Sequence, residues 1–204
     1  MRALILVDIQ NDFLPGGRLA VADGDGVVAV ANRLMDHAEV VVGTLDWHPA
    51  GHESFASAHG GRAPGELVEL HGLPQVLWPD HCVQWTGGAA PAPGLDTARV
   101  RRFFTKGEDP EVDSYSGFWD NGRRHATGLA SWLQTQGVTE VLVCGLALDY
   151  CVKFTALDAH DAGFATTVVV DATRAVNLSD GDGAAAVAAL LAAGVQVVRS
   201  TELD

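Results

Sequence analysis

The sequence predicts an α/β fold in which helices cover both faces of a mainly parallel sheet of about six strands, a three-layer αβα arrangement. Six short apolar runs, each bounded by turn residues, are near-continuous, which is typical of strands buried on both faces. Between several of these runs lie segments whose apolar residues recur with the spacing of an amphipathic helix. Strand and helix therefore alternate along the chain, and this order favours parallel strands joined by helical crossovers.

Each expected element follows from its own stretch of sequence. The apolar runs predict strands at "ALILVD" (3 to 8), "EVVVGTLD" (39 to 46), "VRRFFTK" (100 to 106), "EVLVCGLA" (140 to 147), "ATTVVVD" (165 to 171) and "VQVVRS" (195 to 200). Helical spacing predicts helices at 24 to 37, 124 to 136, 149 to 162 and 181 to 193, the last of them rich in alanine. At the start of the third helix, Asp149 has the place expected of an N-cap residue.

The stretch from about 47 to 99 departs from this alternation. It is rich in Gly and Pro, and it contains several histidines and three of the five tryptophans. Long irregular insertions in compact domains are usually functional. Because a chain of 204 residues usually makes one domain, we expect a single domain over residues 1–204, with a metal-site loop region at about 47–99.

The composition argues against several classes of function. The formal net charge is −13 and the basic residues form no cluster larger than a pair, so we expect no nucleic acid partner. No stretch approaches the roughly 20 apolar residues of a membrane span, so we expect no membrane association. The first apolar run is too short for the core of a signal peptide, which favours the cytoplasm. An odd number of cysteines at irregular spacing argues against a disulfide framework.

Four chemically reactive side chains follow the ends of predicted strands. Asp8 closes the first strand, Asp46 the second and Lys106 the third. Cys151 follows the fourth strand by a few residues. In an open α/β sheet, ligands bind outside the carboxyl ends of the strands, which meet at one edge. We therefore expect these four side chains to lie close together.

A group of potential metal ligands follows the second strand. Asp46, His48 and His52 lie within "DWHPAGH", and His81 lies in "WPDHC" of the same irregular segment. One carboxylate and three imidazoles suit Zn, Mn or Fe in the +2 state. The spacing leaves an alternative open, in which Asp46 caps a turn and the histidines are solvated loop residues.

Cys151 is a candidate nucleophile. In the first turn of the helix predicted at "LDYCVKFTALDA", it would lie near free backbone N–H groups and the positive end of the helix dipole, which stabilise a thiolate. Lys106 would add a positive charge, and Asp8 could take the thiol proton and later deliver it to a leaving group. Taken singly, each residue has an ordinary alternative: a buried cysteine, a surface lysine and a carboxylate bonded to loop amides.

Six stretches together match a known family. They are "ALILVDIQNDFLPGGRLAV" at 3 to 21, "DWHPAGHESFAS" at 46 to 57, "WPDHCVQ" at 78 to 84, "FTKGEDPEVDSYSGFWDNGRR" at 104 to 124, "GLALDYCVKFTALDA" at 145 to 159 and "RAVNL" at 174 to 178. Their combination is highly specific and runs over nearly the whole chain, which resembles the nicotinamidases (pyrazinamidases) of the isochorismatase-like cysteine hydrolases, most closely the bacterial type. The resemblance implies the isochorismatase-like hydrolase fold.

The resemblance also implies roles for seven residues. The catalytic triad of the family corresponds to Asp8, Lys106 and Cys151. Its metal ligands correspond to Asp46, His48, His52 and His81. These four would hold one divalent ion, with Zn the first expectation and Fe or Mn as alternatives, and the ion would coordinate the pyridine nitrogen of the substrate.

A further set of residues is implied to surround the substrate. The oxyanion hole would use the backbone amides of Ala147 and Cys151, next to a cis peptide bond between Leu146 and Ala147. Phe13 and Trp78 would flank the ring. The rest of the expected substrate pocket comprises Tyr115, Leu146, Ala147 and Tyr150.

The implied activity is hydrolysis of nicotinamide to nicotinate and ammonia through a cysteine thioester, with pyrazinamide as a second small-molecule substrate and a role in NAD salvage. Two departures from close relatives are Leu148, where a Thr is common, and Leu14, where a Cys is common. Alternatives are another amidase or isochorismatase of the same fold, a catalytically silent binder of metal or pyridine ligands, and a metal ion that activates the hydrolytic water. The sequence does not decide between a monomer and a homo-oligomer.

Overall fold

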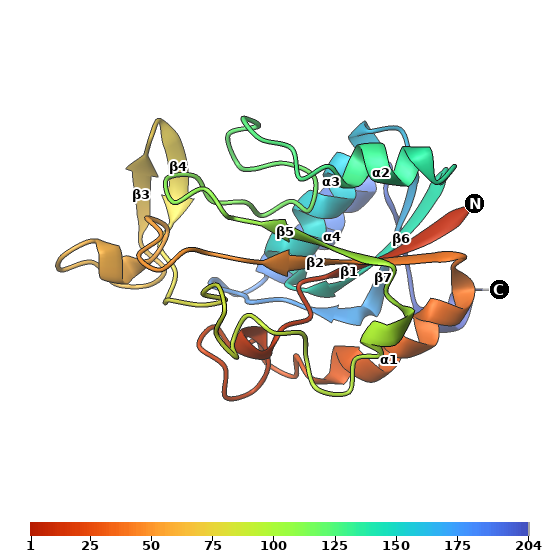
Figure 1. Cartoon of the computed structure of the whole chain (residues 1–204), viewed down its shortest axis with the longest axis horizontal. Helices are drawn as coiled ribbons and strands as arrows, with labels where there is room; N and C mark the ends of the chain where they lie inside the picture. The colour runs from red at the N-terminus through yellow and green to blue at the C-terminus, as the bar shows by residue number, and fades with distance from the viewer. Residues whose placement is uncertain (204) are drawn as a thin grey trace.

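The computed structural model describes residues 1–203 and has the predicted α/β architecture (Figure 1). All six expected strands form one sheet in the order β5-β2-β1-β6-β7-β8, and every neighbouring pair is parallel. The strands are β1 (Arg2–Val7), β2 (Val40–Asp46), β5 (Arg102–Lys106), β6 (Glu140–Leu146), β7 (Ala165–Arg174) and β8 (Gln196–Val198). The carboxyl ends of β1, β2, β5 and β6 therefore lie side by side at one edge.

Helices cover both faces of this sheet because each strand sends apolar side chains to both sides. One face buries Leu4 and Leu6 of β1 against α1 (Gly26–Leu34). The other face buries Ile5 of β1 under three helices, which are α2 (Leu129–Thr135), α3 (Lys153–Asp161) and α4 (Asp182–Ala192). Within residues 1–203, no helix has the length and apolar character that a membrane span requires.

The helix predicted at 124 to 136 begins later than expected. α2 starts at Leu129, because Gly128 before it has a left-handed backbone conformation with φ of 87°. Helical spacing in the sequence extends through this residue, but a right-handed helix does not include a residue with positive φ. The prediction was therefore right about the element and wrong about its first turn.

The irregular segment between β2 and β5 contains a small sheet of its own. Strands β3 (Leu67–Leu70) and β4 (Leu73–Val76) form an antiparallel hairpin beyond the carboxyl ends of the main strands (Figure 1). His71 and Gly72 make its two-residue turn, and both have positive φ, as this type of hairpin connection requires. The expectation of an irregular loop missed this hairpin.

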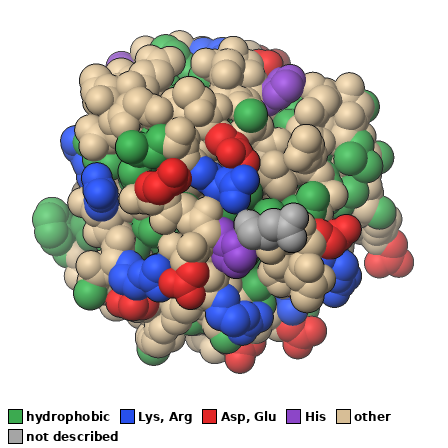
Figure 2. Space-filling view, turned by 90° about the vertical axis from the view of Figure 1, so that its right-hand side faces the viewer, with side chains coloured by type: hydrophobic (Ala, Val, Ile, Leu, Met, Phe, Trp, Pro, Cys, Tyr) green, Lys and Arg blue, Asp and Glu red, His purple; other side chains and the backbone are tan. Residues whose placement is uncertain are grey.

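The surface at the opposite edge of the sheet is electrostatically mixed. Figure 2 shows this face, where Lys and Arg side chains lie among Asp and Glu side chains. Such interspersed charges do not form the continuous basic surface that a phosphate backbone attracts.

Candidate active site

Four buried, reactive side chains meet at the carboxyl edge of the sheet, as predicted. Asp8 directly follows β1, and Asp46 and Lys106 are the last residues of β2 and β5, where they pair in register. Cys151 lies in a π-helical turn (Leu148–Val152) between β6 and α3. All four are almost completely shielded from solvent. The parallel sheet thus places two carboxylates, one amine and one thiol in a single buried cluster.

Lys106 is the centre of this cluster. Its Nζ lies 2.9 Å from Asp8 Oδ2, 3.0 Å from Asp46 Oδ1 and 3.5 Å from Cys151 Sγ. It also donates a hydrogen bond of 2.8 Å to the carbonyl oxygen of Ser114. Burial opposes the charged form of the amine, but Asp46 and Asp8 outweigh it and raise the pKa of Lys106 well above its usual value. Lys106 is therefore a fixed positive charge beside the thiol.

Asp8 has one oxygen held by the protein and one directed at the cluster. Thr44 Oγ1 donates a 2.6 Å hydrogen bond to Asp8 Oδ1, whereas Oδ2 has only the ion pair with Lys106 among the described residues. Burial raises the pKa of Asp8, and Asp46 adds to the rise, against the opposing effects of Lys106 and Thr44. A carboxylate with raised proton affinity, and with one oxygen that is paired only with the Lys106 ammonium, is suited to accept a proton.

Cys151 differs from the expectation of a stabilised thiolate. Burial raises the pKa of its thiol well above the usual value, and Asp8 and Asp46 add to the rise although Lys106 opposes it. The resting side chain is therefore a thiol, and forming the thiolate requires a proton acceptor nearby. Ligand atoms of Asp8, Asp46 and Cys151 lie within 4.8 Å of one another, so Asp8 is within reach.

The turn that carries Cys151 is fixed by contacts the sequence did not reveal. Asp149 is not an N-cap, so that prediction was wrong: its two carboxylate oxygens accept hydrogen bonds from the backbone N–H groups of Val176 and Asn177, at 2.9 and 2.8 Å. These bonds fasten the loop after β7 to the turn. The peptide bond between Leu146 and Ala147, just before the turn, is cis, as the family resemblance implied.

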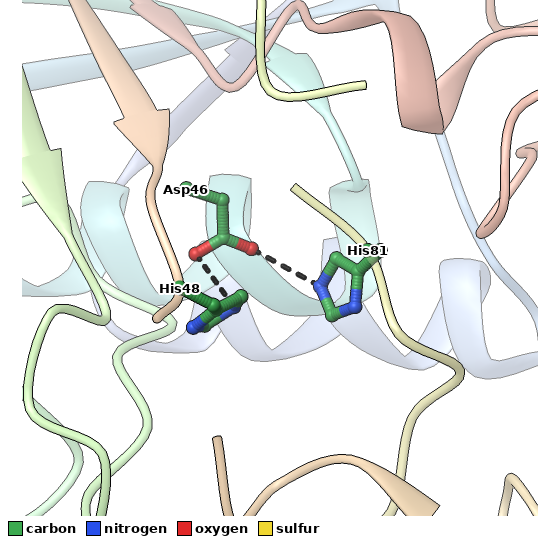
Figure 3. A group of neighbouring side chains, drawn as sticks. All are labelled: Asp46, His48 and His81. Atoms are coloured by element: carbon green, nitrogen blue, oxygen red, sulfur yellow. Dashed lines mark ion pairs between the residues drawn. The ribbon is translucent and has the colours of Figure 1, made fainter. Parts of the chain in front are cut away.

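Three potential metal ligands form a compact, buried group. Asp46 Oδ1 lies 3.2 Å from His48 Nε2, and Asp46 Oδ2 lies 3.3 Å from His81 Nε2 (Figure 3). The other ring nitrogens face backbone carbonyls: His48 Nδ1 is 2.9 Å from the oxygen of Gly107, and His81 Nδ1 is 2.8 Å from that of Pro79. These contacts orient both rings with Nε2 toward the carboxylate, as is common for metal-binding histidines.

The electrostatics of this group fit a cation. His48 Nε2 is buried and, within residues 1–203, has no hydrogen bond partner. Burial alone would lower the pKa of His48, but Asp46 and Asp113 outweigh it and raise the pKa. Burial alone would raise the pKa of Asp46, yet His48 and Lys106 hold it well below its usual value. The negative charges of Asp46 and Asp113 that stabilise a protonated His48 would also stabilise a divalent metal ion at this place. The carboxylate oxygens and imidazole nitrogens are donors that suit such an ion.

His52, the fourth residue implied as a ligand, falls into a second group of donors. Its ring centroid is 4.5 Å from that of His48, and it shares the second group with His48 and Asp113. Asp113 is buried, and its Oδ1 lies 3.9 Å from His48 Nε2. Sequence reasoning missed Asp113, although it lies in the matching stretch "PEVDSYSG", seven residues after Lys106. Its spacing from the other donors carries no recognisable pattern.

A small cavity of about 20 Å³ lies next to the cluster. Its lining comprises Phe13, Leu19, Asp46, Trp78, His81, Asp113, Tyr115, Ala147, Tyr150, Cys151 and Val176. The aromatic residues expected around the substrate are thus present, and the rings of Trp78 and Tyr150 make an edge contact with centroids 4.8 Å apart. Leu146 differs from the expectation, because it does not contribute to this lining and packs into the core on the α1 side.

Comparison with known proteins places this site in a family. A model of the isochorismatase domain matches residues 2–202. This chain belongs to the isochorismatase family. Its six-stranded parallel sheet flanked by helices is the fold of the isochorismatase-like hydrolases.

Within the isochorismatase family, this chain is similar to proteins named as nicotinamidases or pyrazinamidases. A nicotinamidase of Escherichia coli (strain K12) is 52% identical over 197 residues, which cover 95% of this chain and 92% of that protein. The structure of an Acinetobacter baumanii nicotinamidase and pyrazinamidase is 42% identical, with a TM-score of 0.96, and covers 100% of this chain and 98% of its own. A pyrazinamidase of Pyrococcus horikoshii, whose structure is in complex with zinc, is 34% identical with a TM-score of 0.78 over 97% of this chain and 98% of its own.

Proposed function

We propose that this protein is a nicotinamidase, which hydrolyses nicotinamide to nicotinate and ammonia for NAD salvage and also accepts pyrazinamide. The observation that carries the proposal is the buried cluster of Asp8, Lys106 and Cys151, which borders a small cavity lined by aromatic side chains. The 52% identity to the Escherichia coli nicotinamidase over most of both chains supports the choice of substrate.

The first half of the reaction uses the proton affinities of the cluster. Asp8 Oδ2 takes the proton of the Cys151 thiol as the sulfur attacks the carboxamide carbon of the substrate, so that a carbon–sulfur bond forms. The raised pKa of the Cys151 thiol means that it needs a proton acceptor, and the raised pKa of Asp8 makes this carboxylate a better acceptor than an ordinary one. Lys106, which stays charged, stabilises the anionic forms of both partners.

The second half of the reaction returns the proton. The developing oxyanion would accept hydrogen bonds from the backbone amides of Ala147 and Cys151, two residues that line the cavity. As the tetrahedral species collapses, Asp8 protonates the departing amine, ammonia leaves, and a thioester remains on Cys151. Asp8 then takes a proton from a water molecule that attacks the thioester, and nicotinate leaves as the thiol regains its proton.

Asp46, His48 and His81 would hold a divalent metal ion beside the cavity, to which Asp46 and His81 contribute part of the lining. When bound, this ion supplies a Lewis-acidic contact for the ring nitrogen of the substrate. Zinc is the first expectation, because imidazole and carboxylate donors suit it and the Pyrococcus horikoshii relative is a complex with zinc. Phe13, Trp78, Tyr115 and Tyr150 would enclose the ring.

A comparison of substrates tests this proposal. Purified protein is incubated separately with nicotinamide, pyrazinamide and isochorismate, and ammonia release and substrate loss are measured. We expect ammonia from both carboxamides and no consumption of isochorismate, because the metal-ligand group gives the pocket a partner for a ring nitrogen, which isochorismate lacks. Consumption of isochorismate without turnover of either carboxamide would contradict the proposal and favour an isochorismatase.

A further inference from the structure

The two products of the proposed reaction leave the site at different times. Ammonia departs while the nicotinoyl group is still bound to Cys151, and nicotinate departs only after water has cleaved the thioester. The cavity beside Cys151 has a volume of about 20 Å³, which is space for about one water molecule. Because the ring of the acyl group would fill this cavity, ammonia would have to leave past another wall of the site.

A second, larger cavity lies at the end of β5, and we call it the β5 cavity. Its volume is about 530 Å³, and its lining comes from Thr105 and Lys106 of β5 and from residues within 107–114 and 120–127. The β5 cavity shares no lining residue with the cavity beside Cys151. The two cavities nevertheless approach each other closely.

One side chain and one stretch of backbone separate the two cavities. Asp113 lines the cavity beside Cys151, whereas its neighbour Ser114 lines the β5 cavity. Lys106 also lines the β5 cavity, and its Nζ lies 3.5 Å from Cys151 Sγ. The same Nζ donates a 2.8 Å hydrogen bond to the carbonyl oxygen of Ser114. This hydrogen bond therefore closes the partition next to the sulfur.

The charges around the β5 cavity suit a cation. The carboxylates of Glu108, Asp109 and Asp120 contribute to its lining. Within residues 1–203, Lys106 is the one Lys or Arg in that lining, and two carboxylates inside the active site balance its charge. The imidazole of His125 lies 3.1 Å from Asp120 Oδ2. Ammonia is protonated in neutral water, so these carboxylates attract it after it has left the site, whereas they repel the anion nicotinate.

We propose that the ammonia released from the substrate leaves through the β5 cavity, past the hydrogen bond between Lys106 and Ser114, while the acyl group stays on Cys151. The inference rests on the proposed function and assigns a separate route to one of its products. Asp8 has by then given its proton to the amine, so the departing molecule is neutral ammonia and the charge of Lys106 does not repel it. Ammonia takes up a proton from solvent in the β5 cavity, and nicotinate leaves later through the cavity beside Cys151.

Isotope exchange on the whole chain tests this route. When ¹⁵NH₄⁺ is added to protein that is turning over nicotinamide, ¹⁵N-ammonia attacks the thioester carbon, the carbon–sulfur bond breaks, the sulfur takes a proton, and ¹⁵N-nicotinamide forms. Ala126 is exposed and lines the β5 cavity, so Ala126→Trp fills part of it. We expect this variant to lower both ammonia release and ¹⁵N incorporation by about 10-fold, because a slowed release step limits the whole reaction.

Ala188→Trp is the matched control for this variant. Ala188 is exposed on α4 and lines neither cavity. It should keep both rates, and both variants should keep the inhibition constant of nicotinate, which reports on the cavity beside Cys151. Equal rates in Ala126→Trp and Ala188→Trp would overturn the proposal. If the unmodified protein released no ammonia from nicotinamide, the proposed function itself would be wrong.

A change of charge tests the same route without filling the cavity. Glu108→Lys places an ammonium group in the lining of the β5 cavity, and Glu69→Lys makes the same change on the exposed hairpin strand β3. We expect Glu108→Lys to raise the ammonium concentration for half-maximal ¹⁵N incorporation by about 5-fold, through repulsion of the cation. Glu69→Lys should leave it unchanged. Equal concentrations in these two variants would contradict the proposal even if Ala126→Trp failed to fold.

Discussion

Cys151→Ala is expected to abolish turnover of nicotinamide, lowering kcat by about 10⁶-fold, the scale seen when a nucleophile is removed from a covalent hydrolase. Without the sulfur, no thioester forms, and the remaining groups only bind and polarise the substrate. The variant should still bind one metal ion, because Cys151 is not in the group of Asp46, His48 and His81. Steady-state ammonia release and metal analysis of the purified variant measure both quantities.

Cys144→Ala is the matched control for this experiment. Cys144 is also buried, but it lies within β6 and packs into the core on the α1 side, away from the cavity. We expect it to keep the turnover of the unmodified protein. Activity retained in Cys151→Ala and lost on metal removal would instead support attack by a water molecule that the metal activates.

Asp8→Asn is expected to lower kcat by about 10³-fold, within the range of general acid–base catalysis. The amide has nearly the same shape, and its oxygen can still accept from the Thr44 hydroxyl, which lies 2.6 Å from Oδ1 in the unmodified protein. It cannot take the proton of a thiol whose pKa is raised, and it cannot return a proton to the departing amine. Rapid-quench kinetics with nicotinamide measure the loss.

Two further measurements separate this effect from a loss of structure. Lys106 keeps its ion pair with Asp46 at 3.0 Å in Asp8→Asn, so the metal content and the circular dichroism of the variant should match those of the unmodified protein. A folded, metal-loaded Asp8→Asn protein with kcat within about 10-fold of the original would contradict the role of Asp8 as proton carrier.

The features that could be predicted from the sequence are those set by strong local patterns. Continuous apolar runs predict all six strands, and the rule that ligands bind at the carboxyl ends of parallel strands predicts that Asp8, Asp46, Lys106 and Cys151 lie together. Residue chemistry suggested roles for Asp8, Lys106 and Cys151, and the family resemblance selected these roles over the ordinary alternatives that each residue had taken singly.

The features that escaped prediction depend on contacts between distant segments. Asp149 has the sequence position of a cap, but its carboxylate binds the loop at Val176, 27 residues away. The thiol of Cys151 was expected to ionise readily near a helix start, whereas burial, which a sequence does not display, has the opposite effect on its pKa. Asp113 belongs to the site because the segment after β5 places its Oδ1 3.9 Å from His48 Nε2, a contact that sequence spacing does not indicate.

The central claim is that Cys151 forms a thioester with the carboxamide substrate, and mass spectrometry of the acid-quenched enzyme tests it most directly. Protein turning over nicotinamide is quenched at successive times, its intact mass is measured, and the modified peptide is identified. We expect a nicotinoyl group on the peptide that contains Cys151, and its transfer to hydroxylamine when that nucleophile is added during turnover. Full-rate ammonia release with Cys151 unmodified at every time, and with no hydroxamate formed, would contradict the claim.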